Sequence, residues 1–295
     1  MSEVFIGSEA LAAGLVTRHE LSRFHTRLFP DVNQRRGQVP SLRDRTVAAW
    51  LWSRRQAVIA GAAAAALHGA QWVNDDEPIE LVWASKRPPA GLVVRGETLA
   101  DDEVTRIVGL PVTRLARTAF DLGRHLPRNR AIARLDALSR AICFSNEEVL
   151  RLAERHAGAR GVRRLRDVLP LVDRGAASPK ETWLRLLLID AGFPVPTTQI
   201  AVQNSWGLIA MLDMGWKEFM VAAEYDGDLH RTDRRRYVWD QKRSRLVAGM
   251  GWKAVRVINE DNPQDVITRV HDALTSRGWR PESALTQRPT RRLSA

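Results

Sequence analysis

The chain has almost no cysteine and no long hydrophobic run. Its single cysteine, Cys143, excludes an internal disulfide framework and fits a protein of a reducing cytosol. Acidic Glu3 and Glu9 interrupt the N-terminus, which therefore lacks the charged-then-apolar pattern of a secretion signal. The alanine-rich run at residues 61–67 is far too short to span a bilayer. These absences predict a soluble, cytoplasmic protein with no membrane partner.

Basic residues, in contrast, are in strong excess. The formal net charge is +11 and the pI is about 10.9. This charge favours a polyanionic partner, with DNA first and RNA left open, ahead of a membrane surface. The alternative explanation of this charge is a generally basic surface that reflects an arginine-rich composition and binds no polyanion in particular. At 295 residues the chain is long enough for two domains with cores of their own.

Residues 1–56 predict a winged helix-turn-helix. A short helix capped by Ser8 ends at Gly14, and a capping box at 17–20 opens a second helix to about Leu28. Residues 29–39 then predict a small basic wing, and 41–54 another capped helix. In a winged helix the second helix lies in the major groove while the wing contacts the backbone. The predicted DNA contacts are Arg18, Arg23 and Arg27 on the second helix and Arg35 and Arg36 on the wing. Any antiparallel helix pair would give a similar pattern.

Residues 57–174 predict an α+β and helical region. An alanine-rich helix is expected near 60–68, and strands at 79–83, 92–95 and 104–108. The pattern from 113 to 173 is helical throughout. A small-residue linker at 175–179 precedes a second domain, predicted over 178–276. Its expected order is helix 179–191, strands near 199–203, 208–213 and 220–226, helix 233–250, strand 253–258 and helix 263–276. Residues 277–295 predict a disordered tail, and the fold class is α/β (α+β).

The second domain carries an unusual set of acids on its strands. Glu224 and Asp226 are two apart on one strand and should share a face, and Asp213 closes the preceding strand. Two bare carboxylates about 4 Å apart repel by roughly 4 kcal/mol at an effective dielectric of about 20. Such a cluster needs a proton, a basic side chain or a divalent cation. His230 follows as a candidate general acid or base.

Each of these residues also has a plain structural explanation. Glu181 follows Ser178 at capping-box spacing, and Asp213 could simply end its strand. His230 could lie in an exposed loop, and Arg243 could form an intrahelical salt bridge with Asp240. The predicted phosphate contacts around the acids are Arg231, Arg234, Arg235 and Arg243.

These residues resemble the endonuclease domains similar to the very-short-patch mismatch-repair endonuclease, in the PD-(D/E)XK superfamily. The resemblance covers about 178–273. It is carried by Glu181, Asp213, Glu224-x-Asp226-Gly227-x-x-His230, Asp240 with Arg243, and Gly251-Trp252-x-x-Val255-Arg256. The N-terminal region, at 58–69 and 108–122, resembles the abortive-infection type IV antitoxin-like proteins, which join a winged-helix region to such a nuclease-like domain.

The resemblance implies a mixed sheet flanked by helices and a site for Mg²⁺ or Mn²⁺. Asp213 and Glu224 would be the metal ligands, with Glu181, Asp226 and His230 completing the catalytic set. Asp226 stands where many of the superfamily have lysine, and Ser244 where an aspartate commonly follows the helix arginine.

Two functions follow from this pattern. The first is a metal-dependent DNA endonuclease that hydrolyses phosphodiester bonds and docks on DNA through the winged helix. The second is a non-catalytic DNA-binding transcriptional regulator of the antitoxin type, in which the nuclease-like fold only binds DNA or another subunit. A cognate toxin and a homodimer are left open as partners.

Overall fold

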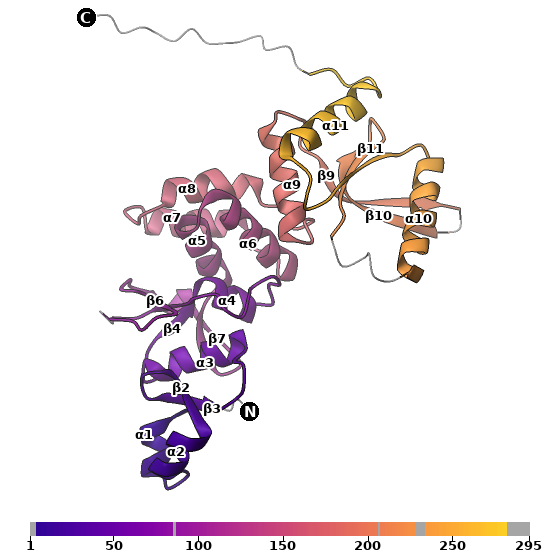
Figure 1. The fold of residues 1–295 in the computed structure, drawn as a ribbon. Helices are drawn as coiled ribbons and strands as arrows, with labels where there is room; N and C mark the ends of the chain where they lie inside the picture. The colour runs from indigo at the N-terminus through magenta and orange to yellow at the C-terminus, as the bar shows by residue number, and fades with distance from the viewer. Residues whose placement is uncertain (1–3, 85–86, 206, 228–233, 282–295) are drawn as a thin grey trace, which may run out of the picture. The chain divides into compact units, whose positions relative to one another are not determined.

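The computed structural model describes residues 4–84, 87–205, 207–227 and 234–281, with the backbone alone at 234–238 and 240. The chain divides into two compact units, Met1–Thr182 and Trp183–Ala295, which are described separately (Figure 1). Both units combine helices with antiparallel or mixed sheets, so the predicted α+β class is confirmed.

The first unit begins with a small three-stranded sheet and two short helices. Gly14, at a φ of +68° that favours glycine, follows the first helix. The second helix starts at a capping box in which Thr17 and Glu20 bond each other's backbone N–H. The strands pair antiparallel in the order β1-β3-β2. The elements are β1 (Phe5–Ile6), α1 (Gly7–Ala12), α2 (Arg18–Phe24), β2 (His25–Phe29) and β3 (Val32–Arg35).

The second helix is shorter than predicted. It was expected to reach about Leu28, but α2 ends at Phe24 and His25 pairs with Arg35 at the start of β2. Pairing with β3 offers this segment a ladder of backbone hydrogen bonds, and its local helical pattern does not reveal that long-range partner. The prediction that Arg27 lies on the helix is therefore wrong, because Arg27 belongs to the wing.

A five-stranded sheet and one long helix form the main core of the first unit. The sheet has the order β6-β5-β4-β8-β7 and mixes parallel and antiparallel pairs. Helix α3 begins at a capping box of Ser41 and Asp44. One apolar cluster joins α3 and this sheet with Ile6 and Val32 of the small sheet. The elements are α3 (Leu42–Trp52), β4 (Val58–Ala60), α4 (Gly61–Leu67), β5 (Ile79–Val82), β6 (Leu92–Arg95), β7 (Val104–Ile107) and β8 (Leu110–Thr113).

The rest of the first unit is helical, as predicted. Its buried residues recur at helical spacing, as at Val149, Leu152 and Ala153 in α7. The elements are the 3₁₀ turn η1 (Asp101–Glu103), α5 (Leu115–His125), α6 (Arg128–Ala141), α7 (Asn146–Arg155), α8 (Val162–Val168) and the 3₁₀ turn η2 (Leu169–Leu171).

The second unit is a mixed sheet with helices on both faces. Helix α9 (Pro179–Asp190) crosses the boundary between the units, so only its part from Trp183 belongs here. The strands lie in the order β12-β11-β10-β9, all antiparallel except β11 with β12, between which α10 makes the crossover. The remaining elements are β9 (Thr197–Asn204), β10 (Gly207–Trp216), β11 (Val221–Tyr225), α10 (Arg234–Gly249), β12 (Lys253–Val257) and α11 (Pro263–Thr275).

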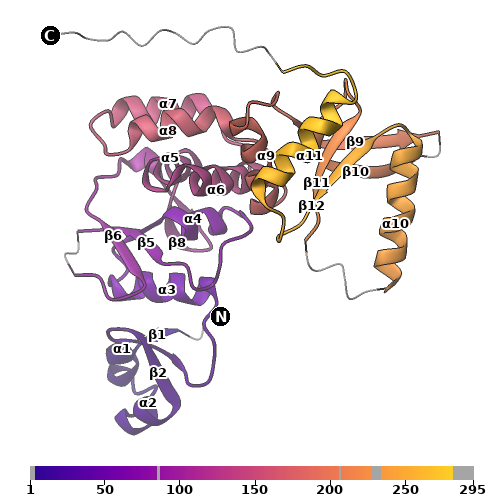
Figure 2. The ribbon, with the colours of Figure 1, turned by 45° about the horizontal axis from the view of Figure 1, so that its top comes forward.

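Two apolar clusters hold this sheet to its helices. The larger joins Leu188 of α9 and Val270 of α11 to β10, β11 and β12. The smaller joins Val247 of α10 to β9, β10 and β11. Figure 2 shows α9 and α11 together, with α10 standing apart from them across the sheet.

Part of the predicted disordered tail is described. Trp279 packs on Phe193 and His271, with ring centroids 5.4 and 5.8 Å apart. The rest, residues 282–295, lies outside the described residues. Within the described part of the chain, no helix is long and apolar enough to cross a membrane.

Candidate functional site

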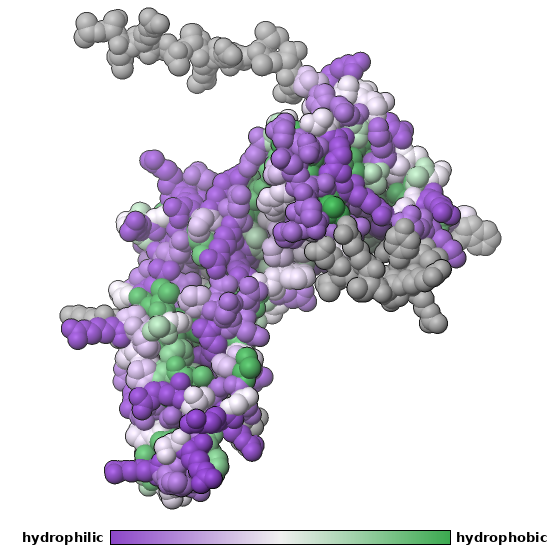
Figure 3. All heavy atoms as spheres, in the orientation of Figure 1, coloured by the Kyte–Doolittle hydropathy of each residue, from purple (hydrophilic) through white to green (hydrophobic). Residues whose placement is uncertain are grey.

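Helix α2 presents its whole length to solvent. None of its residues is buried, and both Arg18 and Arg23 are exposed. The guanidinium of Arg23 lies 5.5 Å from the ring centroid of Phe24, which is 51% exposed. Hydrophilic residues gather at this tip of the unit, over α1 and α2 (Figure 3). A helix that buries so little is available for a partner.

The hairpin β2–β3 adds arginines beside this helix. Arg27, Arg35 and Arg36 are all exposed. Arg36 Nη2 donates to the carbonyl oxygens of Ser22, at 2.8 Å, and His25, at 3.2 Å. Arg36 therefore ties the wing to the end of α2 and fixes the two basic elements relative to each other.

The acids of this region are engaged by nearby groups. Hydrogen bonds from the Thr17 backbone and hydroxyl lower the pKa of Glu20. Burial alone would raise the pKa of Asp31, but hydrogen bonds from Ser8 and Arg54 outweigh it and bring the value below normal. Both carboxylates therefore stay ionised, but the exposed arginines of α2 and the wing outnumber them and give this surface its positive charge.

In the second unit, Asp213 and Glu224 lie on neighbouring strands. The paired register of β10 and β11 runs from Met214–Ala223 to Trp216–Val221, so Asp213 directly precedes it on β10 and Glu224 directly follows it on β11. Asp213 Oδ2 accepts a hydrogen bond of 2.7 Å from the backbone N–H of Tyr225. Asp213 lies within β10, which continues to Trp216, so the prediction that it closes its strand is wrong.

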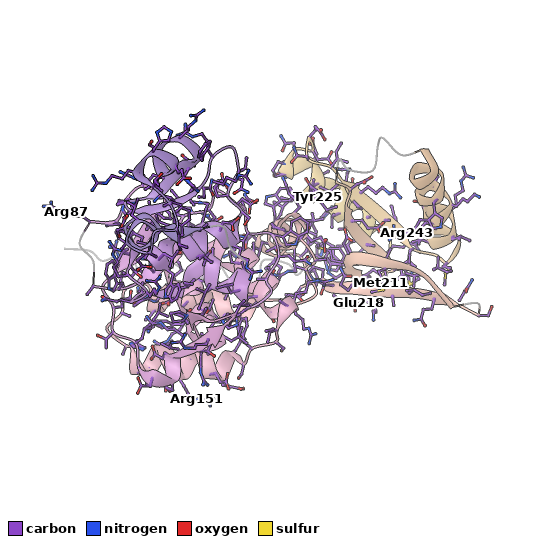
Figure 4. The ribbon with its side chains drawn as sticks, turned by 90° about the horizontal axis from the view of Figure 1, so that it is seen from below. Arg87, Arg151, Met211, Glu218, Tyr225 and Arg243 are labelled. Carbon is purple, nitrogen blue, oxygen red and sulfur yellow. The ribbon has the colours of Figure 1, made fainter. Side chains whose placement is uncertain are left out.

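Glu224 is buried against a basic partner from α10. Its Oε1 accepts a hydrogen bond of 2.8 Å from Arg243 Nη2, which also donates to the carbonyl oxygen of Met211 at 2.6 Å. Only 12% of the Glu224 side chain and 19% of the Arg243 side chain are exposed. Figure 4 labels Arg243 on α10, with Met211 and Tyr225 on the adjacent strands. In this arrangement Arg243 faces an acid of its own chain rather than an external phosphate.

Asp226 directly follows β11. Its backbone N–H donates to the carbonyl oxygen of Val257 at 2.7 Å, which continues the parallel ladder with β12. Asp226 is half-buried. Extended backbone from 224 to 226 keeps the two side chains on one face.

Glu181 lies at the start of α9 and makes the contacts of a capping residue. Its Oε2 accepts from the Ala177 N–H at 2.8 Å, and Ser178 Oγ accepts from the Glu181 N–H at 3.2 Å. Burial raises the pKa of Glu181 above its ordinary value, although hydrogen bonds to its carboxylate from the Ala177 N–H and the Ser178 hydroxyl act to lower it. Its proposed catalytic role stays a prediction.

The described residues do not fit a divalent cation as they stand. Arg243 already neutralises Glu224, and no group of three His, Cys, Asp or Glu among the described residues is placed to hold a metal ion. His230, Arg231 and the side chains of Arg234, Arg235 and Asp240 lie outside the described residues. The Mg²⁺ or Mn²⁺ site therefore stays a prediction.

The sequence did not predict a buried ionic network in the first unit. Arg117, 1% exposed, contacts Glu103, Asp121 and Glu97. Contact with His125, together with Arg124 and Arg117, holds the pKa of Glu97 far below its usual range. The i, i+4 spacing of Arg117 and Asp121 was the available signal, but it does not distinguish a buried pair from a solvated one.

Comparison with known protein families shows that this ionic network lies within a stretch of the chain that matches a known domain. Residues 56–171 match the AbiEi antitoxin C-terminal domain, which confirms the antitoxin-like half of the resemblance. The comparisons give no support to the endonuclease-like half.

Two relatives define its family more closely. They are the uncharacterized proteins Rv2248 and MT2308 of Mycobacterium tuberculosis strains H37Rv and CDC 1551. Each is 30% identical to this chain over 230 residues, which is 76% of this chain and 82% of the relative. The chain belongs to the family of these two mycobacterial proteins.

Proposed function

We propose that this protein is a DNA-binding regulator of the antitoxin type, which represses a promoter through its N-terminal winged helix. The observation that carries the proposal is the exposed helix α2 beside a basic wing, in a chain that matches an antitoxin domain. A cytoplasmic location and a cognate toxin as functional partner belong to the same proposal.

The geometry suggests how each element would act. Helix α2 would enter the major groove, with Arg18 and Arg23 facing base edges or phosphates. Arg27 and Arg35 on the wing would contact the sugar–phosphate backbone. Arg36 would keep helix and wing in register, because it bonds the carbonyl oxygens at the end of α2.

Binding to duplex DNA from upstream of the protein's own gene tests the proposal. Fluorescence anisotropy should show specific binding that Arg23→Ala/Arg27→Ala weakens at least about tenfold, since each lost contact costs on the order of 1 kcal/mol. Arg106→Ala is the matched control, because Arg106 is exposed on β7 and contacts the Gly109 carbonyl. Equal binding by all three proteins would refute a winged-helix role.

A metal-dependent nuclease is the second candidate. One observation favours it: Asp213 on β10 and Glu224 on β11 directly flank the paired segment of these two strands, and Asp226 follows Glu224 by two residues. Incubation of duplex, mismatched and single-stranded DNA with Mg²⁺ or Mn²⁺ tests it. A nuclease should cut at least one substrate and lose that activity in Asp213→Ala. The absence of cutting on every substrate would leave the regulator as the surviving proposal.

A further inference from the structure

The outer face of α10 combines exposed apolar and basic side chains. Trp239 is 59% exposed and Leu246 is 54% exposed. Lys242 and Arg245 on the same helix are also exposed. Residues at i, i+3 and i+7 follow one stripe of a helix, so Trp239, Lys242 and Leu246 form a continuous surface with Arg245 at its edge.

The inner face of α10 is already occupied. Arg243 bonds Glu224 and Met211, and Val247 is buried in the smaller apolar cluster. Trp239 and Leu246 lie four residues before and three residues after Arg243, so the exposed stripe runs beside the face that meets the sheet. In the described part of the chain, neither Lys242 nor Arg245 has a hydrogen bond or ion pair that would neutralise it.

We propose that this stripe binds single-stranded nucleic acid. Trp239 would stack on an unpaired base, while Lys242 and Arg245 would contact the flanking phosphates. Aromatic stacking combined with cations that follow the backbone is how proteins bind single strands without sequence preference. Duplex DNA hides its base faces, so it offers Trp239 no equivalent surface.

Charge argues against a second copy of this chain as the occupant. The chain carries a net charge of +11, and the stripe itself contributes two cations. Two such faces would repel each other, and the two apolar side chains alone offer little area to a protein partner. A polyanion with exposed aromatic faces complements both properties of the stripe.

Anisotropy titrations of the full chain with labelled oligothymidylate test the proposal. Trp239→Ala should weaken binding about tenfold, whereas Trp239→Phe should bind nearly as well because it keeps an aromatic face. Lys242→Gln/Arg245→Gln should lower the slope of log K against log salt by about 1.4, since each phosphate contact on a single strand contributes about 0.7. Lys217→Gln is the control, because Lys217 is an exposed lysine on the β10–β11 turn and not on α10.

Further arms separate this site from the winged helix and from other occupants. The double variant Arg23→Ala/Arg27→Ala should keep the wild-type affinity for the single strand. A labelled RNA oligonucleotide tests whether the stripe distinguishes ribose from deoxyribose. Equal binding by wild type, Trp239→Ala and Lys242→Gln/Arg245→Gln would overturn the proposal. A wild-type dimer that becomes a monomer in Trp239→Ala would also overturn the proposal, because the stripe would then bind a second copy of the chain. If Trp239→Ala fails to fold by thermal melting, the glutamine variant still decides.

Discussion

At the scale of single residues, the pairing of Glu224 with Arg243 changes the interpretation of the acidic strand ends. The acid cluster was expected to need a proton, a basic side chain or a divalent cation, and a guanidinium from α10 supplies the charge for Glu224. The nuclease hypothesis then requires that Arg243 release Glu224 or share it with a cation. The regulator hypothesis needs no such exchange.

This pair should contribute measurably to the stability of the second unit. We expect Glu224→Gln to lower the free energy of unfolding by about 1–3 kcal/mol, because it leaves a largely buried Arg243 without its counter-charge. The double variant Glu224→Gln/Arg243→Met should recover part of that loss, since no unpaired charge remains. Urea unfolding measures both, with Glu218→Gln on the exposed turn as control. Equal stability of Glu224→Gln and wild type would show that the pair contributes nothing.

Glu181 should make stability depend on pH in a defined direction. Burial raises its folded-state pKa above the ordinary 4.5, so the folded protein holds its proton to a higher pH than the unfolded chain. This contribution to stability is present at low pH and is lost as the pH rises through the folded pKa. The stability of Glu181→Gln relative to wild type should therefore increase from about pH 4 to about pH 7. The opposite trend, measured by thermal melting beside Glu154→Gln as control, would contradict the assigned burial effect.

At the scale of elements, the capping box of α2 is expected to control both helix stability and DNA binding. Thr17→Ala removes the hydroxyl that accepts the Glu20 N–H, which should cost about 1 kcal/mol. Since α2 buries none of its residues, little packing compensates, and affinity for duplex DNA should fall with it. Thr268→Ala on α11 is the control, because that hydroxyl bonds within a helix and caps nothing. Unchanged melting and unchanged affinity would show that α2 does not depend on its cap.

The sequence predicted most elements and missed those that depend on long-range pairing. In the second unit, alternating apolar residues and clear helix starts placed every element between 179 and 276 close to its observed bounds. In the first unit, β4 and β8 are short and were not expected, and β2 was assigned to a helix. Strand pairing is decided by partners distant in the chain, which local periodicity does not reveal.

The candidate site was predictable only in part, for a related reason. Strand alternation correctly placed Asp213 and Glu224 on paired strands, because register follows from a tight hairpin. The face of α10 that meets the sheet was not predictable, since Arg243 and its neighbours Lys242 and Arg245 are all basic. Only packing shows that Arg243 is turned inward while the other two are exposed.

At the scale of the whole molecule, the number of phosphates that this basic chain contacts sets the response of DNA binding to salt. Each phosphate contact on duplex DNA contributes about 0.9 to the slope of log K against log salt, through release of bound counterions. Neutralising Arg18, Arg23 and Arg27 together should therefore reduce the slope by about 2.7 if all three contact phosphates. The remaining slope should come from the wing and from other basic surfaces of the chain.

The base-reading role of α2 is separable from this electrostatic effect. An arginine that contacts a base edge changes the preference for the target over unrelated duplex, whereas a phosphate contact weakens both equally. We expect Arg18→Ala, at the start of α2, to reduce that preference more than Arg35→Ala on the wing, because a recognition helix reads bases with its N-terminal residues. Titrations against target and unrelated duplex are run at several salt concentrations. They measure both the slope of log K against log salt and the preference for the target. An equal loss of preference in the two variants would place α2 outside the groove.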